Sequence, residues 1–346
     1  MNRLIVFRSK KGRVSFLVHK RTVTVFAALA LLTFAVFVTG IGLGNTSISP
    51  VDVFRTMMGQ GTAEQEMVIG TLRLPRIIAA VLVGAALSVS GSILQGIVRN
   101  PLASPEIVGI TGGASFAAVA FITYLAGAVS IKWLPVAAFM GAGLVSVAVY
   151  LLAWSKGVTP IRLVLIGIGI SAATGSLTML MITLSPITAA SRAYIWLTGS
   201  IYGASWEQVY MLLPWVAVLI PLALLYSRNV NVQGLGDDVA KGLGAPVQLH
   251  RFILLFISVA LAGSAVAVAG AIGFIGLIAP HIARSLVGPT FGGLIPVAAL
   301  IGSLMLVIAD TVARTVFLPL DIPAGVLTAG VGAPFFIYLL YRNRHQ

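Results

Sequence analysis

Stretches of about 20 apolar residues alternate with short polar connections along nearly the whole chain. A helix of about 20 residues crosses the hydrocarbon core of a bilayer, so the pattern predicts an all-α polytopic membrane protein with about ten transmembrane helices. We expect spans at residues 22–43, 76–98, 106–127, 134–154, 161–184, 207–227, 251–272, 274–287, 294–314 and 323–341. The eighth is short for a straight crossing, and Gly273, Gly276 and Pro280 indicate an interrupted helix there.

Composition agrees with this pattern. Of the 346 residues, 58% are hydrophobic and only 9% are charged, which excludes an ordinary soluble globular domain. The chain has no cysteine, so disulfides, thiolate metal sites and cysteine nucleophiles are excluded as well. The polar connections are too short to form a second core. We therefore expect one transmembrane domain, residues 22–341, between a basic tail (1–21) and a short C-terminal segment (342–346).

The net charge of +13 is concentrated in places that indicate a membrane topology. Seven basic residues precede the first span, and no aromatic-studded basic surface accompanies them, so nucleic acid is not an expected partner. Placing the N-terminus inside puts 16 basic residues on the cytoplasmic side and 6 outside. By the positive-inside rule, both termini are expected in the cytoplasm, which requires an even number of spans. The first apolar run is long for a signal peptide and is interpreted as a retained span.

A small polar island, GLGDDVAKGLGAP at residues 234–246, interrupts the apolar pattern on the predicted cytoplasmic side. Asp237 and Asp238 stand where a helix N-terminus favours negative charge, and Asp237 with Lys241 forms an expected i,i+4 pair. Gly242 and Gly244 supply a stop. The island therefore predicts a short helix, although an ordinary solvated loop remains the alternative.

Three apolar residues of the island, Leu235, Val239 and Leu243, recur every four positions and form one stripe. So short a helix is marginal in water by itself. We therefore expect packing on its own subunit, on a partner, or on both.

Catalytic motifs are missing from the sequence. The phosphate-cradling pattern GxxxxGK[ST] does not occur, and no Lys directly follows a Gly anywhere in the chain. HExxH and GxSxG are absent too. We therefore expect no enzyme activity, and an ATP-driven role would need a separate ATPase.

Five strings together carry a resemblance to a known family. They are RLPR (73–76), GSILQGIVRNPLASPEIVGITGGAS (91–115), GAIGFIGLIAPHIAR (270–284), ADTVAR (309–314) and IPAGVLTAGVGAPFF (322–336). In this order and spacing they resemble the FecCD-type (type II) permeases of ATP-binding-cassette importers for ferric siderophores, haem and vitamin B12. The chain is most similar to the iron-siderophore members, hydroxamate permeases among them; haem and vitamin B12 remain alternative substrates.

The resemblance implies a fold like that of the vitamin B12 importer permease and a multi-pass location in the bacterial cytoplasmic membrane. It also implies partners: a cytoplasmic ATPase dimer, a second permease subunit (forming a homo- or heterodimer), an extracytoplasmic substrate-binding protein and membrane lipid. ATP and Mg would be bound by the ATPase, with no cofactor and no metal ligand on this chain.

Site residues follow from the same resemblance. The island, in the loop 228–250, matches the coupling helix that docks on the ATPase, with candidates Leu235, Asp237, Asp238, Val239, Ala240, Lys241, Gly242, Leu243 and Gly244. Arg73 and Arg314 match arginines that dock the substrate-binding protein. A bidentate hold on a carboxylate suits that role. The alternatives are a membrane-surface anchor or, for Arg314, a pair with Asp310.

The resemblance also indicates a gate. Asn100 and Leu102, in the Asn-Pro-Leu turn after the second span, match a cytoplasmic gate element. Thr159 and Pro160 occupy the place of a second gate element, where this sequence departs from the family's pair of small hydroxyl residues.

Other interpretations have less support from the residues. His281 and Arg284 are polar groups within a predicted span, and helix packing or interfacial hydrogen bonding explains them more simply than contact with substrate. A stand-alone secondary transporter would need charged residues at mid-membrane, whereas most acids here lie at span ends. For an intramembrane enzyme, no pairing of nucleophile and base is visible.

Overall fold

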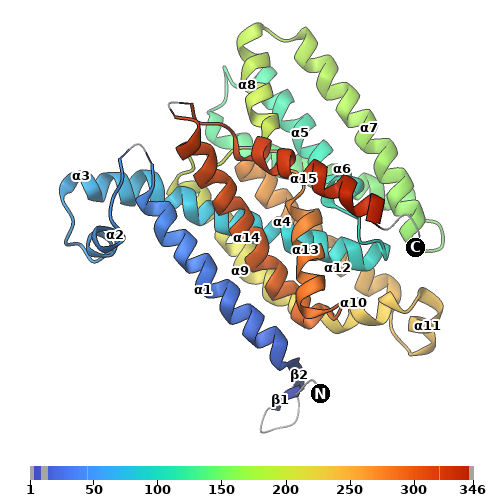
Figure 1. The fold of residues 1–346 in the computed structure, drawn as a ribbon. Coiled ribbons are helices and arrows are strands. Elements are labelled where there is room, and N and C mark those ends of the chain that lie inside the picture. Colours follow the sequence, from blue (N-terminus) through green and yellow to red (C-terminus); the bar gives the residue numbers. More distant parts are fainter. Residues whose placement is uncertain (1–3, 9–14, 45, 319, 343–346) are drawn as a thin grey trace.

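The computed structural model describes residues 4–8, 15–44, 46–318 and 320–342 (Figure 1). Each of the ten expected spans corresponds to a helix. These are α1 (Lys20–Gly42), α4 (Leu74–Val98), α5 (Ile110–Ala120) continued by η3 (Phe121–Leu125), α6 (Leu134–Ala153), α7 (Pro160–Leu184), α9 (Trp206–Leu225), α12 (Val247–Ala269), α13 (Ile275–Val287), α14 (Phe291–Val316) and α15 (Ala324–Arg342). The helical fold class predicted from the hydrophobic pattern is confirmed.

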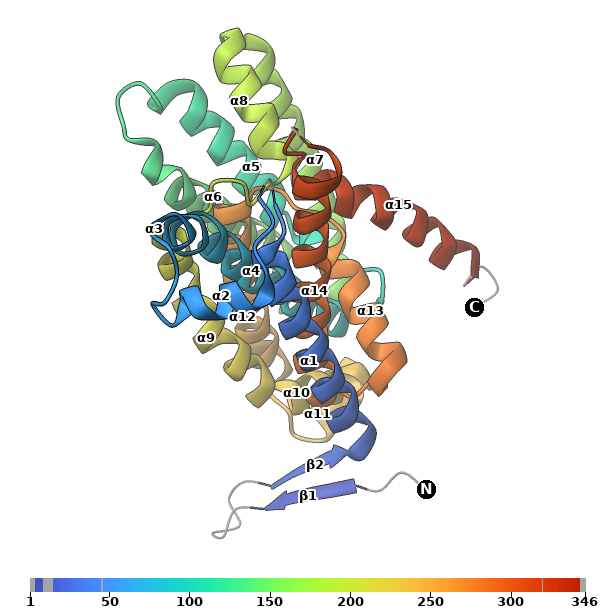
Figure 2. The ribbon, with the colours of Figure 1, turned by 60° about the vertical axis from the view of Figure 1, so that its left-hand side comes forward.

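Shorter elements connect these helices, and most of them were not foreseen. They are β1 (Leu4–Arg8), β2 (Ser15–His19), α2 (Pro50–Met57), α3 (Ala63–Glu66), η1 (Met67–Arg73), η2 (Pro105–Val108), η4 (Ile131–Trp133), α8 (Ile187–Thr198), α10 (Ser227–Gly234) and α11 (Asp237–Gly242). Strands β1 and β2 pair antiparallel, with Leu4 opposite His19. The basic tail thus contains a hairpin at the end of the bundle where α10 and α11 lie (Figure 2).

Eight helices of the described chain are long and apolar enough to cross a membrane. The third and eighth expected spans are shorter apolar helices, Ile110–Leu125 and Ile275–Val287. Before α13 the chain is irregular from Gly270 to Phe274, and both of these residues have positive φ, at 70° and 68°. Such a break inside a membrane protein must be covered by other parts of the fold, because its backbone groups would otherwise lack partners. The ten-span count and the cytoplasmic placement of both termini remain predictions.

Helix α4 lies at the centre of the bundle. In the helical segment Ala63–Val98, which contains α4, 83% of the residues in the most apolar stretch are buried inside the protein. In α7 the corresponding share is 22%. It packs against α14, α12, α13 and α9. Two contacts of α4 are backbone to backbone: a Cβ on Gly84 would collide with the carbonyl of Gly302, and one on Gly91 with that of Gly276. Small residues of this kind let membrane helices approach closely.

Helices α7 and α15 lie at the edge of the bundle. Figure 2 shows α15 extending away from the other helices. Both carry large apolar side chains with no cover from this chain, among them Leu165 and Leu184 on α7 and Val331 and Ile337 on α15. These two helices therefore offer apolar faces to lipid or to another subunit.

Candidate functional site

The polar island forms a short helix, as the sequence predicts. Helix α10 ends at Gly234, and after Leu235 the chain turns at Gly236, whose φ is 108°. Helix α11 then covers Asp237–Gly242, and Gly244, with φ of 80°, follows its end. Both α10 and α11 lie at one end of the bundle (Figure 1).

The apolar stripe of Leu235, Val239 and Leu243 faces away from the protein. These side chains are 62%, 52% and 65% exposed, whereas Ala240 is completely buried. The helix therefore rests on its own subunit through Ala240 and leaves the stripe uncovered. An uncovered apolar surface flanked by charged residues is typical of a protein interface.

The charged residues of α11 do not pair as expected. Asp238 is fully exposed and lies 3.8 Å from Lys241, so the i,i+3 pair replaces the predicted pair of Asp237 with Lys241. Asp237 turns inward instead, where its carboxylate contacts Arg99 at 3.1 Å and Arg251 at 2.8 Å. The prediction for Asp237 was wrong because the spacing rule considers only neighbours on the same helix.

The first candidate gate segment follows directly on one of these arginines. Arg99 ends α4 in the left-handed region, with φ of 57°. The side chain of the next residue, Asn100, accepts a hydrogen bond from the backbone N–H of Leu102 at 2.9 Å. This side-chain turn, together with Pro101, gives the segment a defined shape.

The second candidate gate segment is linked to the other arginine. Arg251 of α12 donates to the carbonyl of Val158. The side-chain amide of Gln248 both accepts from Val158 N–H (3.0 Å) and donates to its carbonyl (3.3 Å). Thr159 and Pro160 come next and begin α7. The structure thus brings both gate candidates to the end of the bundle that carries α11.

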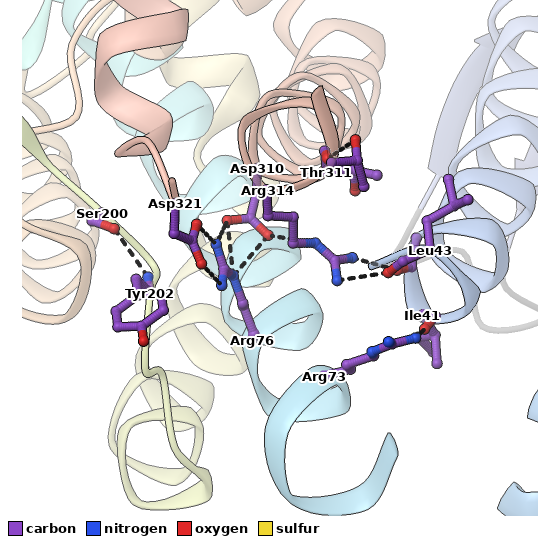
Figure 3. A network of polar contacts seen from close by, with 12 residues as sticks. Ile41, Leu43, Arg73, Arg76, Ser200, Tyr202, Asp310, Thr311, Arg314 and Asp321 are labelled. Carbon is purple, nitrogen blue, oxygen red and sulfur yellow. Dashed lines mark hydrogen bonds and ion pairs between the residues drawn. The ribbon is translucent and has the colours of Figure 1, made fainter. Parts of the chain in front are cut away.

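The two docking candidates lie elsewhere, and both are buried. Arg73 donates to the carbonyls of Ile41 (2.8 Å) and Gly42 (3.0 Å). It also donates to the backbone carbonyl (2.6 Å) and hydroxyl (3.1 Å) of Thr46. Arg314 donates to the carbonyl of Gly40 and to that of Leu43, the second of which Figure 3 shows. The two guanidinium groups therefore satisfy carbonyls at the end of α1 that have no partner within the helix.

A third arginine, Arg76, occupies the centre of this region. It contacts Asp310 at 2.8 Å and Asp321 at 2.9 Å, as Figure 3 shows, and its guanidinium lies 5.4 Å from the ring centre of Tyr202. Asp310 also lies 3.7 Å from Arg314, so the expected alternative of an i,i+4 pair exists. We call Arg73, Arg76, Arg314, Asp310 and Asp321 the arginine cluster.

The arginine cluster borders a cavity of about 500 Å³. Arg73, Arg76, Arg314 and Asp321 line it together with Gly44, Thr46 and Tyr202. Among the described residues, Arg73 contacts only uncharged oxygens, so its positive charge has no carboxylate partner. The cluster as a whole has three cations and two carboxylates.

The sequence alone did not single out Arg76, Asp321, Arg99 or Arg251. Arg76 stands in the RLPR string beside Arg73, and Asp321 directly precedes the IPAG string, so position next to a motif was the available signal. Arg251 is an ordinary basic residue near the start of a span in the sequence. Only the fold shows that its side chain is 1% exposed.

Comparison with known proteins places the chain in a family. A model of the FecCD transport family matches residues 31–342. The chain belongs to this family.

Similar proteins match this chain over nearly its whole length. The Probable siderophore transport system permease protein YfhA of Bacillus subtilis (strain 168) is 48% identical, over 95% of this chain and 97% of the relative. The Achromobactin transport system permease protein CbrC of Dickeya dadantii (strain 3937) is 47% identical, over 100% and 98%. An inward-facing structure described as a metal-chelate type ABC transporter is similar with a TM-score of 0.83 and 32% identity, over 92% of this chain and 99% of the other.

Family membership and the apolar helices together show a multi-pass protein of the bacterial plasma membrane. The resemblance stated from the five strings is therefore confirmed. Within the described part of this FecCD-family chain, no three His, Cys, Asp or Glu side chains are grouped so that they could hold a metal ion. His281 packs edge-on against Phe335, and Arg284 donates to Gln95 Oε1 at 3.0 Å.

The buried ion pairs of the arginine cluster predict a large effect of one substitution. Asp310→Ala leaves Arg76 and Arg314 without their shared carboxylate, and we expect the free energy of unfolding to fall by about 3–5 kcal/mol. Titration with a denaturing detergent measures this change. Glu207→Ala is the control, because its pair with Lys132 is about two-thirds exposed on both sides; removing it should cost about 0–1 kcal/mol. Equal losses in the two variants would contradict the role assigned to Asp310.

Proposed function

We propose that this chain is the permease subunit of an ATP-binding-cassette importer that carries ferric siderophores across the plasma membrane. Membership of the FecCD family carries the proposal, and the names of the similar proteins, which refer to siderophore and achromobactin transport, support the substrate. The chain itself holds no phosphate loop, so ATP would be bound and hydrolysed by a separate subunit. Haem and vitamin B12 are the other substrates that the uptake test below can identify, and either one would leave the permease role unchanged.

Four partners follow from this role. An ATPase dimer in the cytoplasm would contact α11, and an external binding protein would dock at the arginine cluster. A second permease subunit would pack against the apolar faces of α7 and α15. Lipid would cover the rest of the apolar surface. In this arrangement both termini would lie in the cytoplasm, with ten spans between them. ATP binding would then shift the permease between inward- and outward-facing states by favouring one position of α11.

Uptake measurements test the substrate. A strain that lacks this chain should lose ATP-dependent uptake of radiolabelled iron for one class of siderophore and regain it when the chain is restored. A panel of hydroxamate, citrate-type and catecholate siderophores identifies the class, with haem and vitamin B12 as further substrates. Unchanged uptake of every substrate in the deletion strain would contradict the importer role.

The exposed apolar stripe of α11 predicts a defined binding defect. Val239→Asp places a charge where we expect apolar contact with the ATPase, so copurification of the ATPase should fall at least tenfold, roughly the effect of losing one interface hot spot. Met58→Asp is the matched control, since Met58 is 76% exposed and lies next to α2, away from α11. Retained copurification with Val239→Asp would show that the ATPase docks at another surface.

The uncompensated charge of Arg73 predicts an effect on the external binding protein. A carboxylate of that protein entering the cavity would pair with Arg73 and Arg314, so Arg73→Gln should weaken binding about tenfold and reduce its salt dependence. Arg55→Gln is the control, because Arg55 is an exposed arginine on α2. Surface plasmon resonance with the permease in nanodiscs measures both. If binding of the external protein stays unchanged while the permease loses stability, the role of Arg73 is only to satisfy the backbone carbonyls at the end of α1.

A further inference from the structure

The carboxylate of Asp237 connects three separate parts of the chain. Its side chain is 20% exposed, whereas that of its neighbour Asp238 is fully exposed. Oδ1 accepts from Arg99 Nη2 at 3.1 Å and from Arg251 Nη2 at 2.8 Å, and Oδ2 accepts from the same Arg251 nitrogen at 2.9 Å. We call Asp237, Arg99, Arg251 and Val158 the Asp237 junction.

The first arm of the junction leads to the Asn100 turn. Arg99 is the last residue before Asn100, and its backbone adopts the left-handed conformation that few non-glycine residues take. The Asn100 side chain in turn fixes Leu102. A displacement of Asp237 therefore reaches the first gate segment through one side chain and one peptide bond.

The second arm leads to the start of α7. Arg251 binds Asp237 with one terminal nitrogen and the carbonyl of Val158 with the other. Gln248, one turn earlier on α12, holds both backbone groups of Val158. Val158 is completely buried and directly precedes Thr159 and Pro160. The second gate segment is therefore held at the same carboxylate as the first.

Helix α11 has few other attachments to the bundle. Ala240 is its one buried residue, and the helix packs on α10 and α12. The Arg251 side chain is 1% exposed, so loss of Asp237 would leave a buried charge without its partner. Arg99 is 36% exposed, and its hydrogen bond to the carboxylate is charge-assisted and directional. The Asp237 junction is thus the main polar connection between α11 and two segments, one at the end of α4 and one at the start of α7.

We propose that Asp237 is a positioning residue that transmits movement of α11 to both gate segments, through Arg99 to Asn100–Leu102 and through Arg251 to Val158–Pro160. This inference rests on the proposed permease function, in which an ATPase moves α11. It adds that one carboxylate moves the two gate segments together. Their movement is concerted because both arginines are bound to the same carboxylate.

The absence of cysteine from the chain allows each gate segment to be labelled alone. Leu102→Cys reports on the first segment, and Ile161→Cys, at a position 73% exposed, reports on the second. The permease–ATPase complex in nanodiscs is treated with a membrane-impermeant maleimide, with and without ATP. When either cysteine is the only change to the chain (the parent protein), we expect the rate of maleimide labelling with ATP to differ at least threefold from the rate without ATP.

Two substitutions test the arms, and a third is the control. Asp237→Asn should abolish the ATP response of both cysteine reporters and lower iron transported per ATP hydrolysed at least tenfold. Arg99→Gln should abolish the response of the Leu102→Cys reporter alone, because the Arg251 arm persists. Asp52→Asn, another first-turn aspartate paired with an arginine but located on α2, should change nothing.

The outcomes distinguish this inference from the proposed function. An ATP response of both reporters in Asp237→Asn, or loss of both responses in Arg99→Gln, would overturn the two-arm arrangement. Failure of the parent complex to bind the ATPase or to transport iron would contradict the permease role instead. A merely structural Asp237 would lower stability in detergent without changing the ratio of transport to hydrolysis, and that result would also overturn the inference.

Discussion

Buried guanidinium groups that bind backbone carbonyls hold both ends of this helix bundle. Carbonyls at a helix end have no partner within the helix, and the apolar surroundings offer little water to replace one. Arg73 and Arg314 satisfy the carbonyls of Gly40, Ile41, Gly42 and Leu43 at the end of α1, and Arg251 satisfies that of Val158. Carboxylates compensate two of these buried charges, Asp310 that of Arg314 and Asp237 that of Arg251, whereas Arg73 has no carboxylate partner among the described residues.

Between these ends, the bundle combines a closely packed centre with helices that have few buried contacts. Helix α4 touches α13 and α14 through glycine backbones, which leaves no space for rearrangement of side chains. Helix α11 and the edge helices α7 and α15 bury much less of their surface. Parts with few buried contacts are the ones that move at low cost. The proposed transport cycle uses that difference, since the ATPase would act on α11 and the movement would reach the gate segments through defined ion pairs.

Much of this fold was accessible from the sequence because membrane helices carry a strong local signal. All ten expected ranges contain helices, with ends within a few residues of those predicted, and the polar island forms the expected short helix. The hairpin of β1 and β2 and helices α2, α8 and α10 were missed, since elements of 5 to 12 residues are too short to give a clear periodicity. Asp237 was paired with Lys241 because an i,i+4 rule cannot include Arg251 on another helix. Arg76 and Asp321 were missed for the same reason, as they lie 245 positions apart.

The sequence by itself determined that this is a helical membrane protein of the FecCD family with a separate polar helix and no phosphate loop. These properties depend on composition, on periodicity within single segments and on contiguous motifs. The tertiary structure alone decided which charges meet: Arg76 with Asp310 and Asp321, and Asp237 with Arg99 and Arg251. Ion pairs between distant segments depend on how the helices pack against one another, and the pattern of residues within one helix does not predict that packing.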